Sequence, residues 1–221
     1  MLEFLKFYNR PQTYKAEIRV EVENRSNKKA KGHLVVPLPR TTEYQTTTPE
    51  FREPTMAFDL ELEAGEKKSV SVVFKAHVMP RKYNGKIAPE IVQANEFVIS
   101  YLTYGNAIDG LYTAQEAREK RVVDCGGFDT LLQDELKKKG IASNVVAGFW
   151  SDGKMHAWLE IEGNISADPS MEWLRARRKT KKSGKLGFVG SDRIVFSMGE
   201  PFLQKPITDL PHENHLYITR A

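Results

Sequence analysis

The stretch DCGGFDTLLQDELKKKGIASNVVAGFWSDGKMHAWLEIEGNISADPSMEW, residues 124–173, decides our interpretation of the fold. Its first part carries apolar side chains at helical spacing, which predicts a helix with one buried face. These side chains are Phe128, Leu131, Leu132 and Leu136. Three lysines followed by Gly140 are typical of a helix C-terminus, where cations and a glycine are favoured. Asp124 is a suitable N-cap, so we expect Cys125 in the first turn of this helix.

After Gly140 the apolar pattern changes from helical spacing to alternation. Residues 141–173 predict a strand, a Ser-Asp-Gly turn, a second strand, another turn and the end of a third strand. The segment GSDRIVFSMG, residues 190–199, supplies a further strand. Helices followed by an antiparallel sheet form an α+β pattern.

The N-terminal part of the chain has a different character. Residues 13–24 alternate between apolar and charged side chains, which is typical of a half-buried strand. Further short strands are predicted within 31–39 and 57–78, and together they favour an antiparallel β-sandwich. We therefore divide the chain into a β-sandwich accessory domain over residues 1–82 and a second domain over residues 83–221.

Two more helices are expected before residue 124. Apolar residues at helical spacing follow Pro89 and stop before Gly105, in agreement with proline in the first turn and glycine past the end. Thr113 and Glu116 form a capping-box pattern, which predicts a short helix starting at Thr113. The C-terminal residues 207–221 show no pattern that predicts an element.

The composition restricts the class of protein. The 221 residues are 40% hydrophobic and 28% charged, which suits one large or two small soluble domains. A net charge of +4 does not by itself imply a nucleic-acid partner. The single cysteine forms no internal disulfide. We see no signal peptide and no apolar run long enough to cross a membrane, so we expect a cytoplasmic protein.

Cys125 has two interpretations. A free cysteine is often only a small buried apolar residue. At a helix N-terminus, however, unsatisfied N–H groups and a partial positive charge favour the thiolate, the form in which cysteine is a nucleophile. Gly126 and Gly127 cost helix stability and would be tolerated where a substrate backbone comes close. Position alone therefore leaves both a structural and a catalytic role open.

A nucleophilic thiol needs a base, and the base needs a group that orients it. Among the five histidines, His156 is well placed, because it lies on a predicted strand just after a turn and shares a face with Trp158. Asp168 ends a neighbouring predicted strand, where its carboxylate could hold the imidazole N–H. Each residue also has a purely structural interpretation, as a strand histidine and as part of an Asp-Pro turn.

In this order, these features resemble the transglutaminase-like superfamily. The resemblance rests on a cysteine at a helix start, the Lys-Gly-Ile end of that helix, the V-V-A-G-F strand, and the H-A-W and A-D-P motifs. TAQEAREKRVVDC before the helix and DRIVFSMG after the motifs also resemble family elements, so the resemblance covers residues 87–200. The chain departs from the family at Val123, where many members carry glycine, and in the basic segment 175–185.

The resemblance implies a papain-like core of helices packed on an antiparallel sheet. It implies that Cys125 is the nucleophile, His156 the base and Asp168 the orienting carboxylate of a catalytic triad. The implied activity is thiol-dependent acyl transfer on amide bonds through a thioester on Cys125. Water would make the protein a cysteine peptidase or amidase, and an amine would make it a transglutaminase. We favour the hydrolase, and we expect a protein, peptide or other amide substrate.

We expect no cofactor and no metal, because the sequence has neither zinc-ligand spacing nor a calcium loop. An alternative function is that of a catalytically inactive scaffold with the transglutaminase fold. The basic segment 175–185 has a plain interpretation as a mobile surface loop. It could also bind nucleic acid or an acidic partner, but it lacks interleaved aromatic residues, so we expect no nucleic-acid partner. As a border of the active-site cleft, it would favour acidic substrates.

Overall fold

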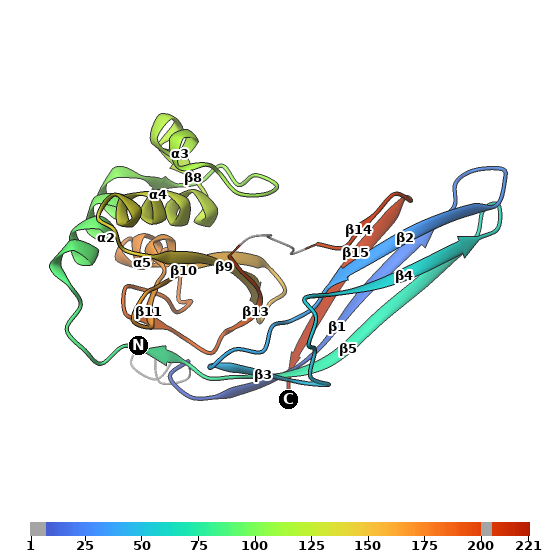
Figure 1. Ribbon diagram of the computed structural model, residues 1–221, viewed down its shortest axis with the longest axis horizontal. Helices are drawn as coiled ribbons and strands as arrows, with labels where there is room; N and C mark the ends of the chain where they lie inside the picture. The colour runs from blue at the N-terminus through green and yellow to red at the C-terminus, as the bar shows by residue number, and fades with distance from the viewer. Residues whose placement is uncertain (1–7, 200–204) are drawn as a thin grey trace.

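The computed structural model describes residues 8–199 and 205–221 (Figure 1). The fold is mixed α+β, and its sheets are mostly antiparallel. A long β-sandwich extends to one side, and helices stacked on a second sheet form the other side (Figure 1). Within the described residues, none of the helices combines the length and apolarity needed to cross a membrane.

The β-sandwich consists of two sheets that share one core. The first has the order β15-β1-β5-β3, and the second the order β14-β2-β4. The strands of the first are β1 (Gln12–Glu23), β3 (Gln45–Thr48), β5 (Lys67–Val78) and β15 (His212–Arg220). Those of the second are β2 (Ala30–Pro37), β4 (Thr55–Leu62) and β14 (Ile207–Thr208). Alternate side chains of β1, β2 and β5 are buried between the sheets, as their period-two pattern predicts.

The C-terminal strands belong to this sandwich. β15 pairs antiparallel with β1 from Tyr14↔Arg220 to Val22↔His212, and β14 pairs with β2. The sequence pattern predicts no element over 207–221 and groups these residues with the second domain, and both expectations need this correction. The physical reason is that the apolar alternation of β15 is confined to Leu216 and Ile218, which are only partly buried, so it is too short to mark a strand.

The second part is a helical layer on the sheet β11-β10-β9-β13. Its strands are β9 (Ser143–Trp150), β10 (Met155–Ile161), β11 (Ile165–Ala167) and β13 (Arg193–Met198). The helices are α2 (Pro89–Tyr101), α3 (Ala114–Lys120), α4 (Cys125–Lys138) and α5 (Pro169–Ala176). Leu131, Leu132 and Leu136 of α4 share a buried cluster with Ala157 and Leu159 of β10. The expected alternation along β10 is therefore present, since Trp158 packs in a different cluster.

Both helix starts expected from capping patterns are present. Thr113 caps α3 in a complete capping box with Glu116. Asp124 caps α4, which ends at Lys138, and Gly140 adopts the left-handed conformation expected after a helix. The short strands β7 (Thr103–Tyr104) and β8 (Val122–Val123) pair in parallel just before α4. They fix the approach of the chain to Cys125.

The two parts share apolar contacts. Phe149 of β9 and Phe196 of β13 belong to the sandwich cluster, and their ring centroids are 4.9 Å apart. Phe196 also contacts Phe74 of β5 edge-to-face. A further connection comes from β6 (Arg81–Lys82), which pairs with β12 (Phe188–Val189) beside the second sheet. The sandwich is thus packed against the face of the sheet that the helices leave open.

Candidate active site

Cys125 is the first residue of α4 and is half-buried. Asp124 caps the helix, because its Oδ1 accepts a hydrogen bond from the N–H of Gly127 (3.3 Å). The other oxygen, Oδ2, accepts one from the N–H of Ile108 (3.1 Å), which ties the preceding loop to the helix start. The helix N-terminus therefore presents Cys125 together with free helical N–H groups, as the sequence predicts.

Gly126 and Gly127 have a different role from the one expected. A Cβ on Gly126 would lie 2.5 Å from the side chain of Leu111, and a Cβ on Gly127 would lie 2.6 Å from Val123. The space at both glycines is thus filled by the protein's own loop and strand. The expectation that they make room for a substrate backbone is wrong; they allow residues 111–123 to pack on the helix.

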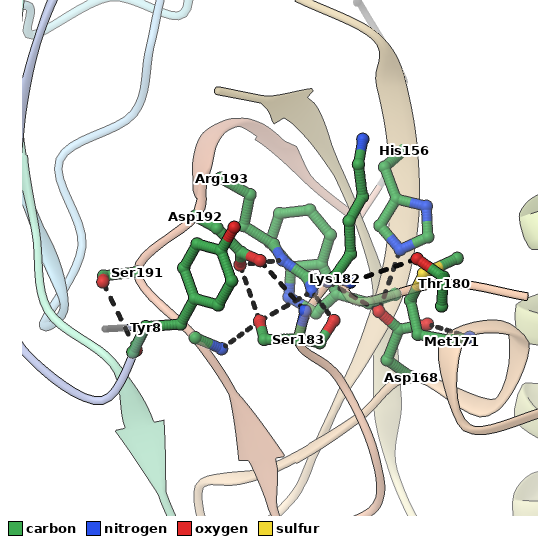
Figure 2. A network of polar contacts seen from close by, with 12 residues as sticks. Tyr8, His156, Asp168, Met171, Thr180, Lys182, Ser183, Ser191, Asp192 and Arg193 are labelled. Atoms are coloured by element: carbon green, nitrogen blue, oxygen red, sulfur yellow. Dashed lines mark hydrogen bonds and ion pairs between the residues drawn. The ribbon is translucent and has the colours of Figure 1, made fainter. Parts of the chain in front are cut away.

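His156 and Asp168 form a buried pair. His156 is the second residue of β10, and Asp168 is the N-cap of α5; the two are 2% and 0% exposed. Nε2 of His156 lies 2.9 Å from Oδ2 of Asp168 (Figure 2). β11 pairs with β10 up to Leu159↔Ala167, so the strand ladder itself brings Asp168 toward His156.

Asp168 is saturated with donors. Its Oδ1 accepts from the hydroxyl of Ser170 (3.0 Å) and the N–H of Met171 (3.0 Å). Its Oδ2 accepts from Nη1 of Arg193 (2.6 Å) in addition to His156. Burial acts to raise the pKa of Asp168, but the charges of His156 and Arg193 outweigh it and hold the pKa below its usual value. Asp168 is therefore an ionised acceptor at neutral pH.

This pairing defines the tautomer of His156. An ionised carboxylate only accepts hydrogen bonds, so Nε2 carries the proton of the neutral imidazole and Nδ1 keeps the lone pair. Among the interactions of the described residues, Nδ1 has no hydrogen-bond partner. Burial lowers the pKa of His156, Arg193 lowers it further, and Asp168 opposes both effects. The ring is thus poised to accept a proton on Nδ1.

The thiol of Cys125 approaches β10 next to His156. Its hydrogen-bonding neighbour there is the backbone N–H of Ala157, which favours the thiolate. Within the described part of the chain, the thiol makes no hydrogen bond with the imidazole. Burial raises the pKa of Cys125, and the carboxyl groups of Asp129 and Asp124 raise it further. These effects favour the neutral thiol over a thiolate–imidazolium pair at rest.

Trp150 covers the imidazole. Its ring stacks on His156 with centroids 4.3 Å apart and planes 28° apart. The guanidinium of Arg193 lies 3.9 Å from the same indole centroid, and Nζ of Lys182 lies 4.4 Å from it. Lys182 is also ion-paired with Asp152 (2.8 Å) in the turn that leads into β10. These contacts shield the His156–Asp168 pair from water.

Asp129 is a second buried carboxyl group in this region. It lies one helical turn after Cys125, on the same side of α4, and is 0% exposed. Neither of its oxygens has a hydrogen-bond partner in the described structure. Burial raises its pKa, and the nearby charges of Asp168 and Asp124 raise it further. Asp129 is therefore neutral over a wider pH range than an ordinary aspartate.

Sequence reasoning missed Arg193, Trp150 and Asp129. Arg193 stands in DRIVFSMG, where nothing distinguishes the arginine from a charged residue on the exposed face of a strand. Asp129 interrupts the apolar face of α4 at the position one turn after the cysteine, and this interruption was the available signal.

The basic segment 175–185 does not behave as a plain surface loop. Ser183 and Gly184 are buried, and a Cβ on Gly184 would lie 2.5 Å from Oδ2 of Asp168. Ser183 donates to Asp192 (2.6 Å) and accepts from Arg193. The segment therefore packs against Asp168, while residues 176–179 stay exposed.

Other polar sites are separate from this one. A cavity of about 460 Å³ lies toward the opposite end of β10, between the 40–44 loop, Arg81 and Glu160. Among the described residues, one group of possible metal ligands has its atoms within 4.8 Å of one another: Glu21, Glu213 and His215. These side chains lie on β1 and β15, and no residue near Cys125 belongs to the group.

Comparison with known proteins gives a likeness to a solved structure. No protein-family model matches the chain, and no curated protein matches it. The chain is similar to the crystal structure of a candidate cysteine protease from Cytophaga hutchinsonii, with a TM-score of 0.57. The two share 10% sequence identity, over 95% of this chain and 90% of that one. The likeness shows a shared fold.

Proposed function

We propose that the protein catalyses thiol-dependent acyl transfer on amide bonds, as a transglutaminase-like enzyme with a papain-like core. In this proposal Cys125 is the nucleophile, His156 the base and Asp168 the orienting carboxylate. The observation that carries it is the buried hydrogen bond from His156 Nε2 to Asp168, which leaves Nδ1 free. The N-terminus of α4 meets the same end of β10 at Ala157.

The reaction would start from neutral partners. Nδ1 of His156 takes the thiol proton of Cys125 while the sulfur attacks the amide carbonyl carbon. Helix geometry leaves the N–H groups of Cys125 and Gly126 without intrahelical acceptors, so they are available to the oxyanion. The imidazolium then gives its proton to the leaving amine nitrogen as the C–N bond breaks. The product is an acyl-thioester on Cys125 and a neutral His156.

Water would complete the cycle. Nδ1 takes a proton from the attacking water, the C–S bond breaks, and the thiolate is reprotonated by the imidazolium. Hydrolysis is preferred to transamidation because the likeness is to a candidate cysteine protease. Asp168 stays ionised throughout and stabilises each imidazolium form.

A catalytically inactive scaffold is the second candidate function. It is favoured by the lack of a hydrogen bond between the thiol and the imidazole within the described residues, and by the raised pKa of Cys125. The two functions differ in one measurable property. A nucleophile reacts with electrophiles faster in the folded protein than in the unfolded chain, whereas a structural thiol reacts more slowly.

The first test is alkylation of Cys125 by iodoacetamide at pH 7.5, in the native and the urea-denatured protein. We expect the native thiol to react at least about tenfold faster. Cys125→Ala should remove all labelling, and His156→Gln should reduce native labelling to the denatured rate. His33→Gln is the matched control, because that ring is exposed and pairs with Asp59 on the sandwich. Equal or slower labelling of the native protein would exclude the enzyme and support the scaffold.

The second test separates hydrolysis from transamidation. A panel of acyl-amide substrates is incubated with the protein, with and without a fluorescent primary amine. Hydrolysis releases a free acid whether or not the amine is present, while transamidation incorporates the fluorophore. Cys125→Ala is the control for both reactions. Fluorophore incorporation that exceeds acid release would overturn the preference for hydrolysis.

A further inference from the structure

Arg193 is one of two buried arginines among the described residues and is only 1% exposed. It is the first residue of β13, at the edge of the second sheet. Burial of an unpaired guanidinium is very costly, so every nitrogen of such a side chain needs an acceptor. The partners of Arg193 therefore show what the residue is placed to do.

All three guanidinium nitrogens of Arg193 have acceptors in this site (Figure 2). Nη1 donates to Oδ2 of Asp168 (2.6 Å), and Nη2 donates to the carbonyl oxygen of Ser183. Nε lies 3.5 Å from Oδ1 of Asp192. The planar fork thus ties β13 and the segment before β12 to the carboxylate at the start of α5. A lysine could supply the charge but not this set of directions.

Arg193 and His156 share two partners. Both donate to the same oxygen of Asp168, and both lie against the indole of Trp150. One carboxylate oxygen and one ring therefore face a permanent cation and a group that can become a cation. The permanent charge makes protonation of the imidazole harder, and its hydrogen bond fixes where Asp168 can hold Nε2.

The other charged groups around His156 come from each element packed against it. Asp168 belongs to the start of α5, Asp192 precedes β13, and Lys182 lies behind Trp150. Cys125 approaches from α4. Of these neighbours, Arg193 and Lys182 carry a positive charge at neutral pH, and Arg193 alone bonds the carboxylate that His156 bonds.

We infer that Arg193 is a positioning residue of the site: it fixes Asp168 and keeps His156 uncharged at rest, so that Nδ1 can serve as the base. The inference rests on the proposed function. Arg193 touches neither the thiol nor the place where a carbonyl would react, so it acts through Asp168 and His156. A purely structural role, holding Ser183 and Asp192 in place, is the competing explanation.

The variants Arg193→Met and Arg193→Lys separate these roles. Arg193→Met removes the charge and keeps the length of the stem, while Arg193→Lys keeps the charge and loses the fork. Arg81→Met is the matched control, because Arg81 is the second buried arginine. It pairs with Glu160 on β10, the strand that also carries His156. Folding of each variant is checked by circular dichroism and urea denaturation.

The main readout is the pH dependence of Cys125 alkylation in the full chain between pH 4.5 and 8.5. Its acid limb reports the group that accepts the thiol proton. We expect Arg193→Met to shift the midpoint of that limb to higher pH by about one unit. At a fixed pH on the limb, the alkylation rate would then be about tenfold lower than in the wild type. Arg193→Lys should keep the midpoint and lower the plateau rate. Arg81→Met should change neither the midpoint nor the plateau.

A second readout does not depend on reactivity. Nitrogen-15 NMR of the imidazole rings reports the pKa and tautomer of His156, with His156→Gln used for assignment. We expect Arg193→Met to raise the midpoint of His156, and Arg193→Lys to leave it in place. If both arginine variants fold with an unchanged alkylation profile and His156 titration, Arg193 is only structural. If Arg193→Met does not fold, a plateau in Arg193→Lys equal to the wild-type value overturns the inference.

Failure of the proposed function gives a different result. In that case His156→Gln leaves the alkylation profile of the wild type unchanged, whatever the arginine variants do. If His156→Gln abolishes the acid limb and the arginine variants do not affect it, the proposed function stands and the role of Arg193 falls.

Discussion

A buried arginine–carboxylate pair lies near each end of strand β10, and the two pairs differ in what else they bind. Near the start of the strand, Asp168 pairs with Arg193 and also accepts from His156. Near its end, Glu160 pairs with Arg81 and accepts from the indole N–H of Trp158 and the hydroxyl of Ser166. Of these two pairs, the first alone is also bonded to an imidazole.

The surroundings of the two carboxylates push their pKa values in opposite directions. Burial raises the pKa of Glu160, and Arg81 offsets this only in part. At Asp168, the interactions with His156 and with the Arg193 guanidinium outweigh burial and lower the pKa. A buried ion pair is therefore not in itself the mark of a reactive site. What distinguishes the first pair is the imidazole with a free ring nitrogen.

The second pair, Arg81 and Glu160, connects two parts of the fold. Arg81 follows β5 of the sandwich, and its guanidinium lies 4.3 Å from the ring centroid of Tyr44 in the loop before β3. Glu160 belongs to the sheet beneath the helices. The pair thus joins the sandwich to the second sheet beside the large cavity. The start of β10 thus belongs to the candidate active site, and its end belongs to a structural connection between the sandwich and the second sheet.

The largest expected difference between the pairs concerns reactivity. Asp168→Asn should lower the rate of acyl transfer by on the order of 10⁴, because an amide does not hold the imidazole in the required tautomer. Glu160→Gln is nearly isosteric and should change the rate by less than about threefold. Both rates are measured on the same acyl-amide substrate. Equal losses in the two variants would show that the pairs do not differ in function.

A large effect on stability is expected at the Arg81–Glu160 pair. Arg81→Met leaves Glu160 buried without its cation, and removing one partner of a buried pair costs about 3 kcal/mol. Urea denaturation measures the free energy of unfolding. The alkylation rate of Cys125 should stay within about twofold of wild type as long as the protein is folded. A stability loss below about 1 kcal/mol would mean that the pair contributes little.

A smaller effect is expected where the basic segment contacts Asp168. Gly184 has φ +133, and an added Cβ would lie 2.5 Å from the carboxylate oxygen that holds His156. Gly184→Ala should therefore displace Asp168 and lower the rate about tenfold. Gly140→Ala is the control, since Gly140 also has positive φ (+74) but no atom within 4 Å of the added Cβ. It should lower stability by about 1 kcal/mol without affecting the rate.

The smallest expected effect is on the pH dependence of stability. The pKa of His156 is lowered in the folded state, so below pH 6.5 the unfolded chain binds a proton that the folded protein does not. Stability should fall as the pH decreases from 6.5, by at most about 1.4 kcal/mol per unit from this group. His156→Gln should remove that slope.

Glu160 should contribute with the opposite sign. Its pKa is raised on folding, so the stability that it contributes is present at low pH and is lost as the pH rises through the folded pKa. Glu160→Gln should therefore make the loss of stability on acidification steeper, and His156→Gln should make it shallower. The urea midpoint between pH 4.5 and 7.5 checks both, and a change of the same sign in both variants would contradict this account.

Local sequence signals predicted much of the arrangement around the site. The Asp124 cap, the apolar face of α4 and the alternation along β10 depend on neighbours within one or two turns, so the sequence contains them directly. The pairing of His156 with Asp168 followed from two adjacent strands. The transglutaminase-like assignment and the reactivity of Cys125 stay predictions.

The rest depends on contacts between residues that are distant in the chain. Arg193 lies 25 positions after its carboxylate partner, and nothing near it in the sequence marks that partner. The burial of Ser183 and Gly184 within a basic run likewise depends on Asp192 and Asp168. β15 is mostly exposed and adds only the partly buried Leu216 and Ile218 to the sandwich core, so its place beside β1 depends largely on backbone pairing.

The pairing of β15 with β1 has a consequence for how the chain is made. β1 appears early in synthesis, but its neighbour on one side, His212–Arg220, leaves the ribosome almost 200 residues later. The second sheet, by contrast, closes between residues 143 and 198. We therefore expect the helical part to fold first. Until β15 is synthesised, one edge of β1 stays unpaired, and an unpaired strand edge can pair with other chains. We expect chaperones to bind the growing chain mainly between the synthesis of β1 and the synthesis of β15.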